Sequence, residues 1–144
     1  MIRHASLIAR RLAGRWAGAL IEGPSGSGKS DLALRALSQG FRLVADDRVL
    51  LWTSGGRLYG RAPDALQDLI ELRGLDVTRV EALPLAEVVL VAALGRPERL
   101  PEPEDEVILG VKTPRLTIAP FEESAAAKLS RAMEVFDAAH NGRI

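Results

Sequence analysis

The feature that most constrains the fold of this 144-residue chain is a glycine-rich octapeptide at residues 23–30. It reads Gly23-Pro24-Ser25-Gly26-Ser27-Gly28-Lys29-Ser30 and fits the pattern G-x-x-x-x-G-K-[ST] at every fixed position. An apolar run at residues 17–22 precedes it, and residues 31–37 follow it with leucines among good helix formers. The sequence therefore predicts a buried strand, a phosphate-binding loop and a helix in succession.

Each part of this unit has a reason in phosphate chemistry. Glycines let the backbone curl so that successive N–H groups point at phosphate oxygens, and the following helix adds its own unpaired N–H groups. We expect all eight residues of the loop to bind a nucleotide, with Lys29 at the β- and γ-phosphates and the Ser30 hydroxyl on Mg²⁺. The alternative is a glycine-rich turn that caps a helix without a nucleotide, and the flanking strand and helix argue against it.

Composition limits the classes of partner. Lys plus Arg equals Asp plus Glu, with 19 of each, so there is no support for a nucleic-acid or anionic-membrane surface. No apolar run approaches the roughly 18–20 residues of a membrane span. The chain has no cysteine, which excludes thiol chemistry and is consistent with a cytoplasmic protein. We expect one domain over residues 1–144, without nucleic-acid or membrane partners.

The rest of the pattern alternates strands with helices and indicates an α/β fold with a mixed sheet. Two helices are expected besides the one after the loop, and the last carries an apolar stripe at Leu129, Met133 and Phe136. The expected strands lie at residues 5–9, 17–22, 41–45, 49–53, 57–60, 88–91, 107–109 and 115–118, and the expected further helices at 62–69 and 122–140. Residues 10–16 are expected to connect a hairpin, and residues 95–106 to form a surface loop.

Two adjacent carboxylates, Asp46 and Asp47, follow the apolar strand at residues 41–45. A parallel α/β sheet places its active site at the carboxyl ends of its strands. Since only a short helix separates this strand from the phosphate-binding loop, it can be the neighbour of the loop's own strand. One carboxylate would organise Mg²⁺ and the other would accept a hydroxyl proton, although turn capping is the alternative for such a pair.

Four other polar residues do not stand out by spacing alone. Glu71 and Arg73 alternate on what can be an ordinary surface strand, and Arg99 sits in a charged loop. His4 is isolated, and a lone histidine is more often structural. The residue pattern by itself therefore assigns no role to these four.

The segment from Ile21 to Val49 resembles the bacterial HPr kinase/phosphorylase family. That family has a G-x-S-G-x-G-K-S loop, a helix that ends in glycine, here Gly40, and an L-V-A-D-D-x-V segment, here residues 43–49. Its E-[IL]-R-G-L and E-R-L motifs are matched at residues 71–75 and 98–100, and its histidine before the loop strand is matched by His4. The resemblance covers nearly all of residues 1–120.

The resemblance implies an HPr kinase/PEP carboxykinase-like fold, a single P-loop domain with a mixed β-sheet and flanking helices, as in the family's short form with the C-terminal kinase domain only. It implies an ATP- and Mg²⁺-dependent kinase of the phosphotransferase system that phosphorylates a serine of the small phosphocarrier protein HPr or a close relative. Asp47 is then the proton acceptor and Glu71 a Mg²⁺ ligand beside Ser30 and Asp46. The other implied catalytic residues are His4, Lys29, Arg73 and Arg99.

One family motif is missing. A P-V-x-P-G-R-N loop is tied to phosphorylase activity in the family, and here residues 120–125 read Pro-Phe-Glu-Glu-Ser-Ala, so we expect weak or no phosphorylase activity. Two other functions stay open: a small-molecule P-loop kinase, although residues 95–106 hold only Arg96 and Arg99 for a lid, and a nucleotide-sensing regulatory module without turnover. Oligomeric state is also open, with a homo-oligomer as one alternative.

Overall fold

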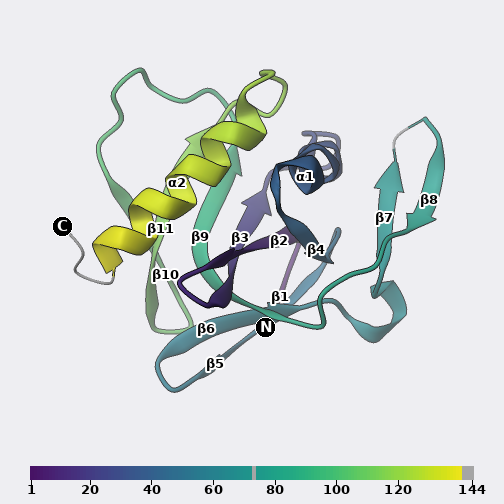
Figure 1. Ribbon diagram of the computed structural model, residues 1–144, viewed down its shortest axis with the longest axis horizontal. Coiled ribbons are helices and arrows are strands. Elements are labelled where there is room, and N and C mark those ends of the chain that lie inside the picture. Colours follow the sequence, from purple (N-terminus) through teal and green to yellow (C-terminus); the bar gives the residue numbers. More distant parts are fainter. Residues whose placement is uncertain (73, 141–144) are drawn as a thin grey trace.

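The computed structural model of the chain describes residues 1–72 and 74–140 and shows a curled mixed β-sheet with two helices against one face (Figure 1). The helices are α1, Lys29–Ala36, and α2, Ala125–His140. A separate two-stranded sheet, β7 (Leu69–Leu72) with β8 (Asp76–Arg79), stands beside α1. The expected α/β class with a mixed sheet is confirmed.

Nine strands form the large sheet, in the order β1-β5-β6-β9-β3-β2-β4, and β11 also pairs with β9 and carries β10 at its other edge. Their bounds are β1 Ile2–Arg3, β2 Ala5–Leu12, β3 Arg15–Glu22, β4 Arg42–Ala45, β5 Val49–Ser54, β6 Arg57–Arg61, β9 Ala86–Leu94, β10 Glu104–Ile108 and β11 Val111–Ile118. The strands β3, β9 and β11 run parallel, whereas β2 is antiparallel to both β3 and β4. The carboxyl ends of β3, β4, β9 and β11 therefore lie at one edge of the sheet.

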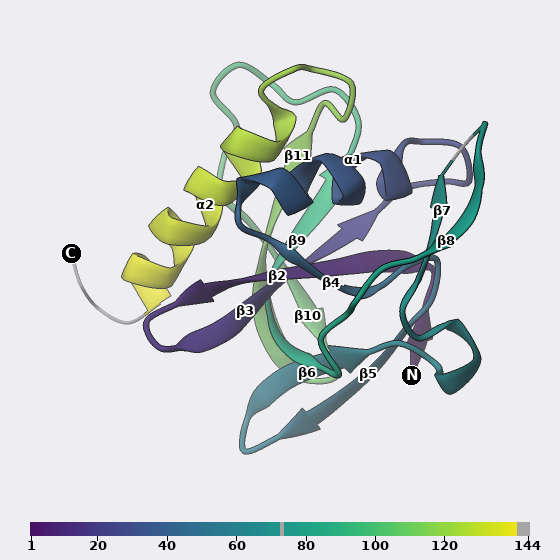
Figure 2. The same cartoon turned by 45° about the vertical axis from the view of Figure 1, so that its right-hand side comes forward.

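The strand that precedes Asp46 is not the direct neighbour of the loop's own strand, so that interpretation of the sequence is wrong. The strand that ends before Asp46 is β4, and it pairs with β2 rather than with β3. The hairpin of β2 and β3 places β2 between them, so β3 and β4 keep the same direction but are one strand apart (Figure 2). The amino-terminal end of β2 consequently lies beside the carboxyl ends of β3 and β4.

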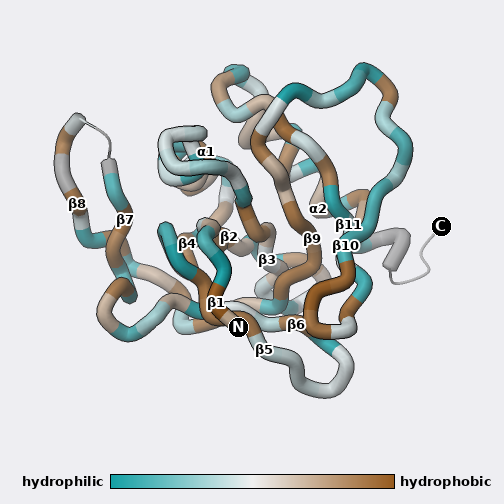
Figure 3. Tube along the Cα trace, turned by 180° about the vertical axis from the view of Figure 1, so that it is seen from behind, coloured by the Kyte–Doolittle hydropathy of each residue, from teal (hydrophilic) through white to brown (hydrophobic). Residues whose placement is uncertain are grey.

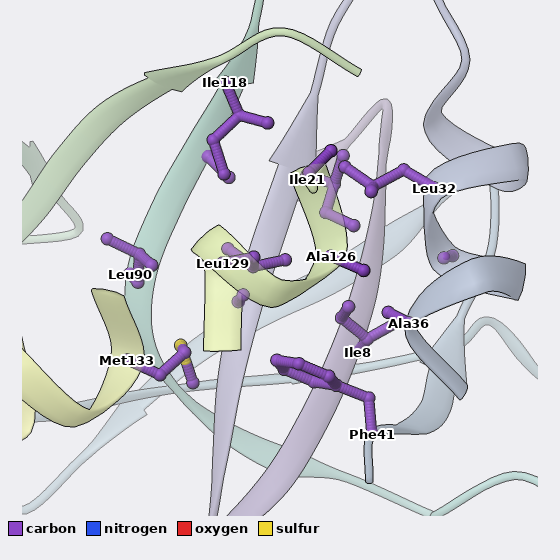
Figure 4. Packing of buried hydrophobic residues seen from close by; sticks show 14 of the residues in the cluster. Ile8, Ile21, Leu32, Ala36, Phe41, Leu90, Ile118, Ala126, Leu129 and Met133 are labelled. Atoms are coloured by element: carbon purple, nitrogen blue, oxygen red, sulfur yellow. The ribbon is translucent and has the colours of Figure 1, made fainter. Parts of the chain in front are cut away.

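Two apolar clusters hold the layers together. On the helix face, Ile21 of β3, Leu32 of α1 and Leu129 of α2 are fully buried in one cluster with Met133 (Figure 4). A second cluster fills the concave side of the curled sheet, around Leu7 of β2. Figure 3 accordingly colours β9 as mainly hydrophobic, because both clusters use its side chains. Among the described residues, no helix has the length and hydropathy needed to cross a membrane.

Local differences from the expected elements have backbone causes. The helix expected over residues 62–69 is one 3₁₀ turn, Asp64–Leu66, because Asp68 adopts a left-handed φ of 64° just before β7. The strand β2 continues to Leu12, so the basic segment is part of the hairpin and the turn is Ala13-Gly14.

Other expected features are confirmed. The chain leaves the helix region at Gly40, whose φ is 86°, as a left-handed cap requires. The hairpin β5–β6 turns at Gly55-Gly56, which both have positive φ. The last helix, expected over residues 122–140, is present as α2 but begins only at Ala125, because residues 122–124 form a turn.

Candidate active site

Three strand ends bring distant parts of the chain together at one edge of the sheet. The glycine-rich loop follows β3, Asp46 and Asp47 follow β4, and His4 precedes β2, which lies between those two strands. Residues from each of these three places line one cavity of about 390 Å³. Its walls are formed by His4, Ser25, Gly26, Gly28, Lys29, Ser30, Asp31, Leu34, Asp47, Glu71 and Leu75.

The loop at residues 23–30 has the geometry of an anion site. Gly28, the residue before α1, has a φ of 100°. Among the described residues no side chain caps the start of the helix, so its first N–H groups face the cavity. The Lys29 ammonium is buried and donates to the carbonyls of Gly23 at 2.6 Å and Pro24 at 3.0 Å. Since an ammonium has three N–H donors, one is left for a phosphate oxygen at the cavity.

The Ser27 hydroxyl lies close to Gly23 within the same loop. A Cβ on residue 23 would lie 2.4 Å from the Ser27 hydroxyl oxygen, so only glycine fits at Gly23. That hydroxyl is buried and has no hydrogen-bond partner within the part of the chain that the structure describes. Because buried polar groups are rarely left unpaired, an oxygen-rich ligand in the loop would satisfy it.

Asp46 is the hub of the hydrogen bonds behind the cavity, and only 5% of it is exposed. Its Oδ1 accepts from the hydroxyls of Ser6 at 2.7 Å and Ser30 at 2.8 Å. Its Oδ2 accepts from the backbone N–H of Glu71 at 3.1 Å. With both oxygens engaged, Asp46 fixes the Ser30 hydroxyl and ties β7 to the loop, and its expected role toward Mg²⁺ stays a prediction.

Asp47 faces the cavity beside His4. Its Oδ1 lies 2.7 Å from Nε2 of His4, and both side chains are about half exposed. Asp47 has a left-handed φ of 68°, and its carbonyl accepts from the N–H of Ala5, the first residue of β2. This uncommon backbone conformation turns the carboxylate away from the buried hub and toward solvent.

The remaining expected site residues are placed differently. Glu71 lines the cavity from β7, with an exposed side chain. Arg73 lies outside the described residues. Arg99 is exposed on the loop between β9 and β10, and it is not among the described residues that line the cavity. The structure thus brings together His4, the loop, both aspartates and Glu71, but not Arg99.

The donor set fits Mg²⁺ held jointly with phosphates. No group of three or more His, Asp or Glu residues in the described ranges forms a complete metal cage. Mg²⁺ in phosphoryl-transfer sites typically takes one or two carboxylates, substrate phosphates and water. The Ser30 hydroxyl, fixed by Asp46, and the exposed Glu71 carboxylate can supply the protein ligands.

A closed group of four charges supports the loop from behind. Glu22, the residue before Gly23, binds Arg3 at 2.5 Å and Arg115 at 3.0 Å. Glu106 binds the same two arginines at 2.7 Å and 2.8 Å. Burial alone lowers the pKa of Arg3 and Arg115, but the hydrogen bonds and charges of the two glutamates outweigh it, so both pKa values are raised. The guanidinium groups therefore stay charged and join β1, β3, β10 and β11 at the start of the loop.

A strand, a phosphate-binding loop, a helix and carboxylates at the same sheet edge define a P-loop protein of the α/β class. Residues 11–90, more than half of the chain, match the HPr Serine kinase C-terminal domain family. The chain belongs to that family.

Individual relatives agree with this assignment. The HPr kinase/phosphorylase of Azoarcus sp. (strain BH72) is 42% identical over 117 residues, which cover 70% of this chain and 37% of that protein. The HPr kinase/phosphorylase of Xanthomonas campestris pv. campestris (strain B100) is 53% identical over 64 residues, 44% of this chain and 20% of the relative. The chain thus matches little more than a third of the length of the first relative and a fifth of the second.

A solved structure shares the fold over the whole chain. The Hpr(Ser) kinase/phosphatase from Coxiella burnetii superposes with a TM-score of 0.75 and 25% sequence identity, covering 99% of this chain and 97% of that one.

Two contacts at the site were not found by sequence reasoning. Ser6 is one, because nothing in a single buried serine of an apolar strand points to a carboxylate 40 residues away. Phe121 is the other, since its contact with the loop depends on where β11 lies in the sheet.

Proposed function

We propose that residues 1–144 form one cytoplasmic kinase domain that transfers the γ-phosphoryl group of ATP, with Mg²⁺, to a serine of HPr or a close relative. The observation that carries the proposal is that Asp47 and His4 line the same cavity as Lys29 and Ser30. A base and a phosphate site that face one cavity are what phosphoryl transfer to a hydroxyl needs.

In this reaction the acceptor serine enters the cavity beside Asp47, which takes the hydroxyl proton as the oxygen attacks the γ-phosphorus. A bond forms between the serine oxygen and phosphorus, the bond from phosphorus to the bridging oxygen breaks, and ADP leaves. His4 donates from Nε2 to Oδ1 of the ionised Asp47 and so fixes the direction of the carboxylate.

Lys29 and the N–H groups at the start of α1 hold the β- and γ-phosphates and stabilise the charge that shifts during transfer. Ser30 and Glu71 would hold Mg²⁺, and when bound this ion neutralises charge on the phosphate oxygens. Asp46 keeps the Ser30 hydroxyl oriented for that contact.

The test is transfer from γ-labelled ATP to purified HPr, in the presence of Mg²⁺, by the purified chain. We expect label on wild-type HPr and none on an HPr variant in which the acceptor serine is alanine. Label on a small molecule but not on HPr would favour a small-molecule P-loop kinase. Tight ATP binding without transfer to any acceptor in a cell lysate would favour the nucleotide-sensing module.

A further inference from the structure

A large aromatic ring lies on the glycine-rich loop without being buried by it. A Cβ on Gly28 would lie 3.1 Å from Cε1 and Cζ of Phe121, so the ring packs on the backbone of residue 28. Nevertheless Phe121 is 73% exposed. An exposed phenylalanine in contact with a phosphate-binding loop has a free face that a flat ligand can cover.

The strand order places this ring on the side of the loop away from the reacting groups. The edge of the sheet runs β4, β2, β3, β9 and β11, with the loop after the central β3. Asp47 follows β4 at one end of this series, whereas Phe121 follows β11 at the other. A nucleotide whose last phosphate faces Asp47 must therefore extend its nucleoside end from the loop toward Phe121.

The segment that carries Phe121 is held to α1. Arg35 donates to the carbonyls of Pro120 and Glu122, the two residues that flank Phe121, and its Nε binds Asp31 at 2.9 Å. The N–H of Glu122 also donates to the carbonyl of Ala119. The ring is therefore presented on a fixed turn whose position is set by the same helix that begins at the phosphate site.

We propose that Phe121 is the platform on which the base of the bound nucleotide stacks. This inference rests on the proposed function, because it concerns the nucleoside end of the same substrate. Stacking on an aromatic ring is tolerant of base identity, since every base has a π-face. Stacking therefore does not distinguish adenine from guanine, and GTP depends on Phe121 as ATP does.

The test compares ATP with tripolyphosphate, which has the phosphates but no base. Calorimetric titrations with Mg²⁺ are run on the wild-type chain, Phe121→Ala and Leu100→Ala, which removes an 87%-exposed apolar side chain from a neighbouring loop. Phe121→Ala should weaken ATP binding by about 5- to 150-fold, as base–aromatic stacking predicts, and leave tripolyphosphate binding within about twofold. Leu100→Ala should change neither.

A second variant gives an optical readout. In Phe121→Trp, ATP should quench emission from the new indole while tripolyphosphate does not, after subtraction of the wild-type signal from Trp16 and Trp52. Equal loss of both ligands in Phe121→Ala would mean that the ring only packs the loop, and unchanged ATP binding would mean that no stacking occurs. Either result overturns the inference and leaves the proposed kinase function standing. A wild-type chain that binds neither ligand would overturn both.

Discussion

At the scale of single residues, the proposed reaction assigns different roles to Asp46 and Asp47. Adjacent in sequence, they point into different environments, because Asp46 is buried among hydroxyl and N–H donors and Asp47 is half exposed beside His4. Protein donors take both oxygens of Asp46, whereas the exposed Asp47 lines the cavity at the phosphate site, within reach of an incoming hydroxyl.

Asp47→Asn should therefore lower the rate of transfer to HPr by about 10²- to 10⁴-fold, the usual effect of removing a general base. ATP binding should be kept, because Asp47 is not part of the glycine-rich loop. The matched control is Asp31→Asn, which neutralises another cavity-lining carboxylate that pairs with Arg35 instead of His4. Near-normal turnover by Asp47→Asn, measured with labelled ATP, would contradict its role as the base.

We expect Ser6 to affect the reaction indirectly, by holding Asp46. Ser6→Ala removes the 2.7 Å hydrogen bond to Oδ1 of Asp46. The carboxylate that orients the Ser30 hydroxyl is then held less firmly. We expect the Mg²⁺ concentration for half-maximal rate to rise several-fold and stability to fall by about 1.5–3 kcal/mol, the usual contribution of a hydrogen bond to a charged group. Ser38→Ala, which removes a hydroxyl hydrogen bond to Arg35 at the far end of the helix region, is the control. A stability loss with unchanged Mg²⁺ dependence would reduce Ser6 to a packing role.

At the scale of elements, one apolar stripe of side chains on α2 packs the helix layer against the sheet. Leu129 and Met133 are fully buried against β3 and β9 side chains, while Val135 on the same helix is 52% exposed. Leu129→Ala should reduce the free energy of unfolding by about 2–5 kcal/mol because it leaves a cavity. Val135→Ala should cost well under half as much, and equal losses in chemical denaturation would show that the stripe is not what holds α2.

Elements that depend on local sequence could be predicted, and those that depend on strand order could not. The glycine-rich loop, the Gly40 cap, the Gly55-Gly56 hairpin and the α2 stripe all follow from residues within a few turns of one another. The position of β2 between β3 and β4 follows from non-local pairing, and no periodicity records it. Ser6 depends on that pairing and Phe121 depends on the pairing of β11 with β9, which explains why their contacts were not foreseen.

The same distinction between local and non-local signals holds for the candidate site. Lys29 and Ser30 are placed by an eight-residue pattern, and the structure sets them at the cavity with Asp47. His4 and Glu71 were expected only from the family resemblance, because a lone histidine and an alternating glutamate carry no local signal. Both line the cavity.

At the scale of the whole molecule, the segment at residues 120–122 bears on the direction of the phosphoryl transfer that we propose. Reversal by inorganic phosphate needs a second anion site, with N–H donors and cations. Here Arg35 is committed to the carbonyls of Pro120 and Glu122, and the Glu122 carboxylate pairs with Lys128 at 2.7 Å. The segment therefore offers exposed acidic and aromatic side chains at the chain position where the family motif has glycine, arginine and asparagine.

We accordingly expect the chain to phosphorylate HPr but to release it slowly, or not at all, from phosphoserine-HPr. The measurement supplies purified phosphoserine-HPr and millimolar phosphate with Mg²⁺ and follows pyrophosphate, the product of phosphate attack on phosphoserine. The forward reaction on the same preparation serves as the control for active enzyme. Because Glu122 and Glu123 carry like charge to phosphate, Glu122→Gln with Glu123→Gln should raise any residual reverse rate and leave the forward rate nearly unchanged. Efficient pyrophosphate formation by the wild-type chain would show that the cationic loop of the family is dispensable for reversal.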